Sequence, residues 1–374
     1  MKIKTPVIIV GGGLAGLTAA IHLLKIGIEV ILIEKNEFPK HKVCGEYISN
    51  EVLPYFQWLN IDIQELRPVS ISKLQFSIEN GQTINCKLPL GGFGVSRYAL
   101  DEFLYKKGVA AGCQMIQDNV ESVVFSDNQF KVSTSNSGIF ESEIVLGAFG
   151  KRFNIDQKLS RKFIQKKSSW LAVKAHYSFD FPDDVVGLHT FEGGYCGLSK
   201  VESNRVNVCY LTHYDTFKKY LNIEEFQQKV VSVNPHLKLI FQKGKMLFEK
   251  PLTISQISFE KKNAVENHIL MIGDSAGLIH PLCGNGMAMA IHGAKIASEL
   301  TGDYFNAKIG SRSELEQRYN TAWKTNFEER LKTARFLTKI LQRPKLTGFV
   351  MQLLVLFPSL LAFIIRKTHG KSIL

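Results

Sequence analysis

The stretch VIIVGGGLAGLTAAIHLLKIGIEVILIEK, from Val7 to Lys35, decides the fold. Its opening β-branched run VIIV leads into Gly11-x-Gly13-x-x-Gly16, an apolar helical pattern follows, and a second β-branched run closes the unit. This order predicts a β-α-β unit with a dinucleotide-binding fingerprint in its first turn. Gly11 permits the tight turn, Gly13 lets the backbone approach a pyrophosphate, and Gly16 allows the helix to pack closely on the strand.

The residues around this turn specify the kind of nucleotide. Leu14 and Ala15 begin the expected helix, whose positive end faces the pyrophosphate. Glu34 and Lys35 follow the second strand, about 20 residues downstream, where a carboxylate accepts hydrogen bonds from the ribose hydroxyls. A 2′-phosphate would be repelled there, so the pattern favours FAD or NAD over NADP.

Composition bounds the class of protein. The chain has 374 residues, 45% hydrophobic and 21% charged, which predicts a globular protein of two or three units. Its six cysteines are scattered without a C-x-x-C pair, so we expect neither a metal site nor a disulfide framework. The first apolar run is already the nucleotide-binding strand, and we therefore expect no signal peptide and a cytoplasmic location.

The net charge of +12 suggests an anionic partner or surface. Lysines and arginines are dispersed and accompany no recognition motif, so we expect no nucleic-acid partner. The basic residues that do cluster flank the apolar stretch near residue 350, which favours a membrane surface.

The loop after the second strand contains KHKVCGE. A loop leaving this strand passes over the cofactor, so we expect Lys42, Cys44 and Gly45 to approach its ribityl or ring portion. The alternatives are a small buried thiol for Cys44 and a solvated charge for Lys42.

The next segment combines a hairpin and a helix. Residues Val69 to Leu88 alternate apolar and polar around Asn80-Gly81, which predicts a β-hairpin with a two-residue type I′ turn. Residues Val95 to Cys113 read as a helix with Arg97 in its first turn, an unfavourable place for a cation beside the helix dipole. This position suggests an anionic partner, the FAD pyrophosphate, although a surface arginine remains an alternative. Three further alternating segments, 174–179, 186–202 and 205–213, predict antiparallel strands that cover a substrate cavity.

The second decisive stretch is HILMIGDSAGLIHPLCGNGMAMAIHGAKIASEL, from His268 to Leu300. An apolar strand ends at Gly273-Asp274, where the aspartate can hold a ribityl hydroxyl. A glycine loop then opens a helix of small residues and aims backbone N–H groups at the N1–C2=O edge of a flavin. The expected contacts of this loop are Pro281, Gly284, Asn285, Gly286 and Met287.

These motifs resemble the FAD-dependent oxidoreductase group that contains the aromatic (class A) flavin hydroxylases, geranylgeranyl reductases and flavin-dependent halogenases. The resemblance spans roughly residues 5 to 300 and rests on GGGLAG with Glu34, on Arg97 of VSRYALDEFL and on GDSAGLIHPLCGNGM. It implies FAD as cofactor, NAD(P)H as electron donor, and Cys44 and His280 as candidate catalytic residues.

Within this group, KVCGEYIS and HPLCGNGM look closest to the geranylgeranyl-reductase branch. Two segments depart from the pattern. GGYCGLSKVE lacks the aromatic W-x-F-P pattern of the reductases, and GAFGKR has Phe149 where the group carries the aspartate of a D-G pair. The W-x-W-x-I-P signature of halogenases is absent.

The apolar run Gly348 to Ile365 is close to the lower limit of about 18 residues for a membrane span. Pro358 should break it into two short helices. The alternatives are a helical hairpin that covers the substrate cavity, an interfacial membrane contact, and a span. Basic residues bracket the run: Arg343, Lys345, Arg366, Lys367 and Lys371.

The sequence therefore predicts an α/β (α+β) protein with a Rossmann-like, glutathione-reductase-like FAD domain, an inserted antiparallel-sheet substrate domain and a C-terminal helical segment. The expected bounds are 1–68, 90–165 and 255–303 for the FAD domain, 69–89 and 166–254 for the substrate domain, and 304–374 for the helices. The expected function is oxidation or reduction of a hydrophobic substrate, phenolic, polyketide or isoprenoid-like. It leans to hydroxylation with reduced flavin and O2, with C=C reduction as the alternative and halogenation third. The non-enzymatic rival is a flavin- or lipid-binding protein. We also consider a peripheral contact with the inner face of a membrane.

Overall fold

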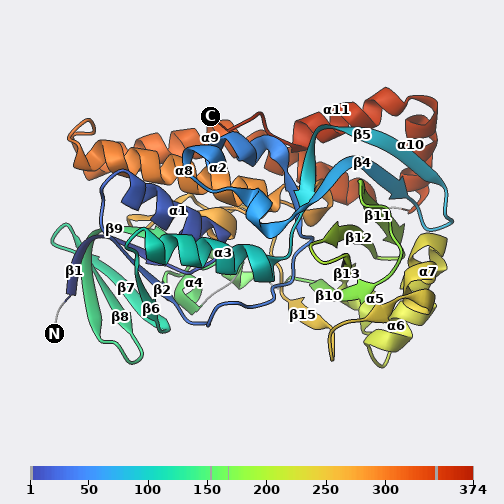
Figure 1. Cartoon of the computed structure of the whole chain (residues 1–374), viewed down its shortest axis with the longest axis horizontal. Helices are drawn as coiled ribbons and strands as arrows, with labels where there is room; N and C mark the ends of the chain where they lie inside the picture. Colours follow the sequence, from blue (N-terminus) through green and yellow to red (C-terminus); the bar gives the residue numbers. More distant parts are fainter. Residues whose placement is uncertain (1–2, 152–153, 167, 342–343, 374) are drawn as a thin grey trace.

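The structure is a computed structural model that describes residues 3–151, 154–166, 168–341 and 344–373. Two β-sheets lie at opposite ends of the long axis (Figure 1). Three helices extend along the first sheet: α1 (Leu14–Lys25), α8 (Gly286–Phe305) and α9 (Arg312–Leu341). Two more, α10 (Pro344–Leu356) and α11 (Pro358–Thr368), cover strands of the second.

The first sheet forms the expected nucleotide-binding unit. Its strand order is β16-β17-β9-β1-β2-β6, with β1 paired in parallel with both β2 and β9. An antiparallel hairpin of β7 and β8 continues from β9. The strands are β1 (Ile3–Val10), β2 (Val30–Glu34), β6 (Gln114–Gln117), β7 (Val120–Ser126), β8 (Gln129–Thr134), β9 (Ile139–Gly147), β16 (Val265–Glu266) and β17 (Ile269–Met271).

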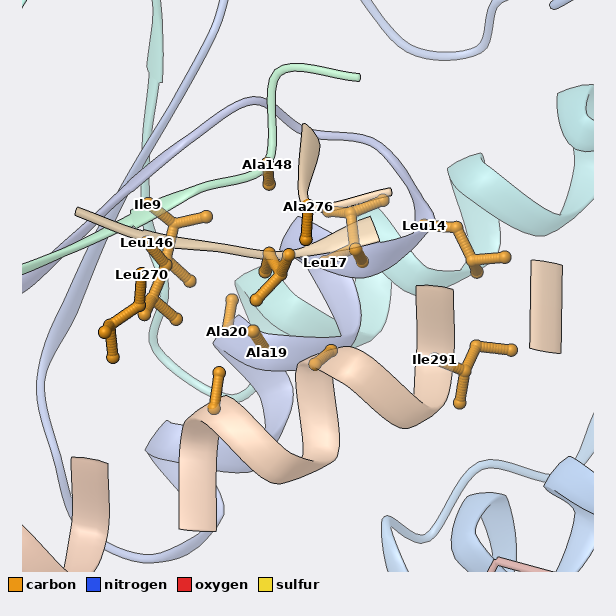
Figure 2. Packing of buried hydrophobic residues seen from close by; sticks show 14 of the residues in the cluster. Ile9, Leu14, Leu17, Ala19, Ala20, Leu146, Ala148, Leu270, Ala276 and Ile291 are labelled. Carbon is orange, nitrogen blue, oxygen red and sulfur yellow. The ribbon is translucent and has the colours of Figure 1, made fainter. Parts of the chain in front are cut away.

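Small and apolar side chains bring two helices onto this sheet. Helix α1 (Leu14–Lys25) contacts α8 (Gly286–Phe305) through an alanine-rich face, and Ala19 and Ala20 are fully buried there. In Figure 2 Leu146 and Leu270, from neighbouring strands, lie together on the sheet side of this helix pair. The first sheet also carries α3 (Arg97–Ala110) and α4 (Asn154–Lys158), and α2 (Leu53–Trp58) lies near α8. This packing fixes the glycine turn at the start of α1.

The second sheet has the order β14-β10-β13-β12-β11-β4-β5-β3, with β15 paired to β10. Its pairs are antiparallel except β4 with β11, which run parallel. The strands are β3 (Tyr47–Ser49), β4 (Val69–Ser77), β5 (Thr83–Gly94), β10 (Trp170–Ser178), β11 (Val185–Phe191), β12 (Gly194–Val201), β13 (Arg205–His213), β14 (Lys245–Met246) and β15 (Leu252–Ser255). Helices α5 (Tyr214–Phe217), α6 (Ile223–Lys229) and α7 (Pro235–Lys243) pack beside it.

The β4–β5 hairpin forms as predicted, but its turn is of another kind. A type I′ turn at Asn80-Gly81 needs positive φ at both residues, and only Gly81 has it, at +87°. Gly81 N–H instead donates to the Ile78 carbonyl at 2.8 Å, and Asn80 Oδ1 accepts from Gln82 N–H at 3.0 Å. The asparagine side chain stabilises the longer loop, so the prediction of a two-residue I′ turn is wrong.

The last helices are α9 (Arg312–Leu341), α10 (Pro344–Leu356) and α11 (Pro358–Thr368). The predicted break at Pro358 is confirmed, because Phe357 separates α10 from α11. One face of this hairpin packs on the second sheet, where Met351, Leu354 and Leu361 join a buried cluster with Ile71 and Leu74. Of the helices in the described part of the chain, none has the length and apolarity that crossing a membrane requires.

Two of the predicted flanking cations cannot be placed. Arg343 and the side chain of Lys345 lie outside the described residues. The division of the chain into domains also stays a prediction. The strands expected in the substrate domain, from 69–89 and 166–254, do share the second sheet.

Candidate active site

One large cavity lies between the two sheets and the C-terminal helices. Its volume is about 1340 Å³, more than the roughly 300–1,000 Å³ of a pocket for one small ligand. It extends from the glycine turn after β1 to the inward face of α10 and α11. The cavity therefore has room for a dinucleotide and a second molecule.

The glycine turn has the geometry that the fingerprint predicts. Gly11 has φ +108°, and a Cβ there would lie 2.5 Å from the Ala148 carbonyl oxygen. A Cβ on Gly16 would collide with the Gly11 carbonyl. A Cβ on Gly13, in contrast, would meet no protein atom within 4 Å, and Gly13 lines the cavity. The backbone is thus open toward the cavity at the one glycine expected to approach a pyrophosphate.

Glu34 closes this end of the cavity. Its carboxylate accepts hydrogen bonds from Gly12 N–H at 2.7 Å and from Asn36 N–H at 2.9 Å. The first bond links the end of β2 to the turn after β1, so the acid and the glycine loop form one rigid unit.

Gly273 and Asp274 lie opposite this unit, at the end of β17. Gly273 has φ +61°, and its Cβ position is 2.9 Å from Ala15. Asp274 lines the cavity, and its carbonyl accepts from Lys262 Nζ at 2.7 Å. Burial lowers the pKa of Lys262 to about 8 against the raising effect of Asp274. The chain is therefore held at the position where the sequence predicts a ribityl contact.

Arg97 lines the cavity together with Lys42, and both cations bind one carboxylate. Arg97 donates to both oxygens of Asp101 at 2.7 Å, and Lys42 Nζ donates to it at 2.8 Å. Burial alone would raise the pKa of Asp101, but Arg97 and Lys42 hold it below its ordinary value. Two positive groups on one negative group leave one net positive charge beside the cavity, which suits an anionic ligand.

A second buried ionic cluster connects the loop before β3 with strand β10 of the second sheet and with the first residue of α3. Glu46, which has φ +54°, follows the KVCG segment and accepts from Lys174 Nζ at 2.5 Å and from Arg97 N–H at 2.7 Å. Its other oxygen lies 2.7 Å from His176 Nε2. Burial would raise the pKa of Glu46, but Lys174 and His176 lower it below its ordinary value. This cluster fixes the loop that carries Cys44 against strand β10.

The sequence reasoning missed this cluster. Its only local signal is the K-A-H segment in an otherwise apolar strand, which places Lys174 and His176 on the same face of β10. Two buried titratable side chains on one strand face require a buried partner of opposite charge or a hydrogen-bond acceptor.

The two candidate catalytic residues have different surroundings. Cys44 is partly exposed and lines the cavity near Cys209. His280 is not among the described residues that line it, and its ring lies between Trp170, Tyr195 and Phe259. Neither ring nitrogen of His280 has a hydrogen-bond partner among the described residues, and burial lowers its pKa to about 3.

The expected flavin-edge loop is fixed from behind by Asn285. Its amide donates to the buried Glu51 carboxylate at 3.3 Å and accepts from Arg330 of α9 at 3.2 Å. Glu51 also accepts from Gly370 N–H at 2.5 Å, and its carbonyl accepts from Ile373 N–H at 2.8 Å. Burial raises the pKa of Glu51, although these donors favour its charged form. The loop, α9 and the segment after α11 therefore share one buried carboxylate.

The far end of the cavity is apolar. Strands of the second sheet form one wall and the C-terminal helices form the other. The apolar lining residues at this end are Leu74, Phe76, Leu88, Val186, Leu188, Val350, Met351, Leu354, Leu361, Ile364 and Ile365.

Most of the residues predicted to bind the cofactor line this one cavity. They are Gly11, Gly13, Leu14, Ala15, Glu34, Lys35, Lys42, Cys44, Gly45, Arg97, Gly273, Asp274, Pro281, Gly284, Gly286 and Met287. Gly16 packs behind the turn and Asn285 supports its loop. The individual contacts stay predictions. In the described part of the chain, no group of three acidic, histidine or cysteine side chains could hold a metal ion.

The residues present fit FAD. The open face of Gly13, the N-terminus of α1 and the positive Arg97–Lys42–Asp101 cluster suit a pyrophosphate. Glu34 suits ribose hydroxyls, and the N-terminus of α8 at Gly286 faces the same cavity. Each of these groups comes from a different segment, yet they line one continuous space.

Comparison with known proteins agrees with this assignment. Residues 4–127 match the profile of a family described as "FAD binding domain". Conditioned medium factor receptor 1 of Dictyostelium discoideum is 23% identical over 371 residues, covering 89% of this chain and 70% of that protein. Digeranylgeranylglycerophospholipid reductase 1 of Methanosphaera stadtmanae is 24% identical, covering 89% and 84%. The FAD-dependent monooxygenase janM of Penicillium janthinellum is 25% identical, covering 80% and 68%.

Solved structures share the whole architecture. The flavin-dependent brominase Bmp2 superposes with a TM-score of 0.79 at 17% identity, covering 98% of this chain and 93% of its own. A geranylgeranyl bacteriochlorophyll reductase-like protein from Thermoplasma acidophilum gives 0.75 at 19% identity, covering 91% and 88%. These similarities show the fold.

Fold, site and relatives define the class: the chain is an FAD-dependent oxidoreductase. The resemblance to the group of flavin hydroxylases, geranylgeranyl reductases and flavin-dependent halogenases is confirmed, and so is the predicted fold class.

Proposed function

We propose that this oxidoreductase reduces a C=C bond in a long apolar, isoprenoid-like substrate. One observation carries the proposal: the cavity continues from the flavin-edge loop into a space walled by aliphatic side chains of two sheet strands and two helices. Such walls bury a hydrocarbon chain and offer few groups to orient a polar ring. The reductase relative from Methanosphaera, matched over most of both chains, supports the same reaction.

The protein's part in this reaction is to bind, orient and exclude water. FAD, when bound and reduced by the electron donor, would supply the hydride. Glu34, Gly13 and the cationic cluster at Arg97 hold the nucleotide, and the aliphatic walls keep water from the reacting carbons. A reduced double bond also needs a proton, and the Cys44 thiol, which lines the cavity, is the candidate to hold one at Sγ. NAD(P)H is the proposed electron donor.

A second candidate is hydroxylation of an apolar ring, to which the sequence alone leans. It is favoured by the likeness to the monooxygenase janM. Halogenation is a weaker choice, because the W-x-W-x-I-P signature is absent from the sequence.

Oxygen separates the two reactions. We expect the chemically reduced enzyme to convert a polyprenyl substrate under anaerobic conditions, since C=C reduction consumes no O2. Product that forms only after oxygen is admitted, with one oxygen atom incorporated, would support hydroxylation and contradict the proposal. Product analysis by mass spectrometry distinguishes the two.

A variant tests the use of the cavity. Leu188→Trp places a larger side chain in the apolar end and should lower turnover while FAD absorbance is retained. The matched control is Leu221→Trp, because Leu221 is 93% exposed and does not line the cavity. Equal losses in both variants would show that the substrate lies elsewhere.

A further inference from the structure

The hairpin of α10 and α11 is apolar on two opposite faces. Its inward face includes the buried side chains of Met351, Leu354 and Leu361. Its outward face carries large apolar side chains that are far more exposed to solvent than those of the inward face. A helix that is apolar on all sides is normally covered on all sides. We call the outward set the hairpin surface, and it comprises Phe349 (58% exposed), Leu356 (70%), Phe357 (59%), Leu360 (38%) and Phe363 (52%), together with Phe336 (64%) of α9.

Helical spacing brings these residues together. Phe349 and Leu356 lie seven residues apart on α10, and Leu360, Phe363 and Lys367 follow at intervals of three and four on α11. Leu356 and Phe357 form the corner between the helices. The result is a ridge of aromatic and aliphatic side chains, which is the kind of exposed patch that marks an interaction site.

The charge around this ridge suits an anionic partner. From residue 331 to residue 374 the sequence has no Asp or Glu, while it has eight Lys and Arg, against a net charge of +12 for the whole chain. They are Lys332, Arg335, Lys339, Arg343, Lys345, Arg366, Lys367 and Lys371. Arg366 and Lys371 are exposed, and Arg366 lies next to Phe363 on the outward half of α11. Apolar side chains flanked by cations are the chemistry of a helix that lies on an anionic lipid surface.

The hairpin surface also adjoins an opening of the cavity. Phe336, Leu360 and Phe363 are exposed and line the cavity at the same time. They therefore stand at a mouth between α9 and α11, and beyond them the aliphatic wall begins.

We propose that the hairpin surface binds the face of an anionic lipid bilayer, with its aromatic side chains at the headgroup boundary and the mouth of the cavity toward the lipid. A lipophilic molecule then passes from the bilayer into the cavity without crossing water. Only this passage rests on the proposed function, and the binding to lipid can be measured without any turnover.

The test is sedimentation of the FAD-loaded full chain with vesicles of phosphatidylcholine alone and vesicles that also contain phosphatidylglycerol. We expect binding to the anionic vesicles that weakens as salt is added. Phe357→Ser combined with Phe363→Ser should lower binding roughly tenfold or more through lost apolar burial. Arg366→Gln combined with Lys371→Gln should lower binding by roughly 25-fold, because each cation near such a surface contributes about a fivefold factor.

Matched controls lie beside the second sheet, one in the segment before α6 and one on α7. Leu221→Ser and Lys238→Gln change an exposed apolar side chain and an exposed cation outside the hairpin surface and should leave binding unchanged. FAD absorbance reports that each variant is folded. Equal binding to neutral and anionic vesicles, or full binding by both double variants, would overturn the proposal. A dimer that dissociates in the phenylalanine variant would also overturn it, because the surface would then bind a second copy of the chain.

Discussion

The ammonium of Lys174 lies 2.5 Å from the carboxylate of Glu46, and neither side chain is exposed to solvent. The two residues are 128 positions apart: Glu46 lies in the loop before β3, and Lys174 lies on strand β10 of the second sheet. A buried ion pair of this kind need not add net stability, but removing one partner leaves the other charge buried alone. The pair therefore fixes how the loop with Cys44 meets the strand beneath it.

Glu46→Gln should lower the free energy of unfolding by about 3–5 kcal/mol, because Lys174 would keep its charge without a counterion. Urea unfolding measures this loss. The control is Glu260→Gln, whose partner Lys166 is exposed, and a surface pair contributes only about 0–1 kcal/mol. Equal losses of unfolding free energy in the two variants would contradict the burial of the Glu46–Lys174 ion pair.

The same carboxylate predicts a pH dependence. The pKa of Glu46 is below its ordinary value of 4.5, so the unfolded state takes up the proton first as the pH falls. Its contribution is therefore complete above that value and is lost on acidification. Stability measured from neutral pH downward should fall less steeply in Glu46→Gln than in the unmodified protein.

Gly13→Val should abolish FAD binding and leave the fold intact. The backbone at Gly13 has φ −79°, which any residue adopts, and the new side chain would meet no protein atom near Cβ. It would fill the side of the turn where the pyrophosphate is expected. Bound flavin is read from absorbance after gel filtration, and circular dichroism reports folding. Gly108→Ala is the control, since its Cβ has ordinary contacts far from the turn. Normal flavin content in Gly13→Val would refute this placement.

Features that depend on near neighbours could be predicted from the sequence. The glycine turn, the β4–β5 hairpin and the break at Pro358 each follow from a few adjacent residues. The prediction of a two-residue turn at Asn80-Gly81 was wrong, because the Asn80 side chain accepts a hydrogen bond that stabilises a longer loop. The partners of Glu46 could not be predicted, because no local pattern indicates which distant strand will face a loop carboxylate. The same holds for the parallel pairing of β4 with β11.

Cys44→Ser should leave FAD content unchanged and lower turnover, because a hydroxyl holds its proton far more tightly than a thiol does. Steady-state rates at matched flavin content provide the measurement. Cys86→Ser is the control, because Cys86 lies on β5 and is not among the described residues that line the cavity. If the two variants turn over substrate at equal rates, Cys44 has a packing role and does not hold the proton.

His280→Leu should raise stability at acidic pH. The pKa of the buried imidazole is about 3 against an ordinary 6.5, so protonation favours the unfolded state as the pH falls through this interval. The stability difference between variant and unmodified protein should grow by up to about 1.4 kcal/mol per pH unit there. Retained turnover would assign His280 a packing role among Trp170, Tyr195 and Phe259. A complete loss of turnover with normal flavin content would make it catalytic.

The hydrogen bonds of the Glu51 carboxylate also determine when, during translation, the loop that contains Asn285 gains its full support. Glu51 supports the expected flavin-edge loop through Asn285 and is itself bound by the backbone of Gly370, 319 positions later. A ribosome adding about 5–20 residues per second needs roughly 15–60 s to cover that distance. Throughout this interval the nascent chain contains Glu51, but the Gly370 N–H that donates to its carboxylate has not yet been made. The support behind the loop that contains Asn285 is therefore completed only after Gly370 has been translated.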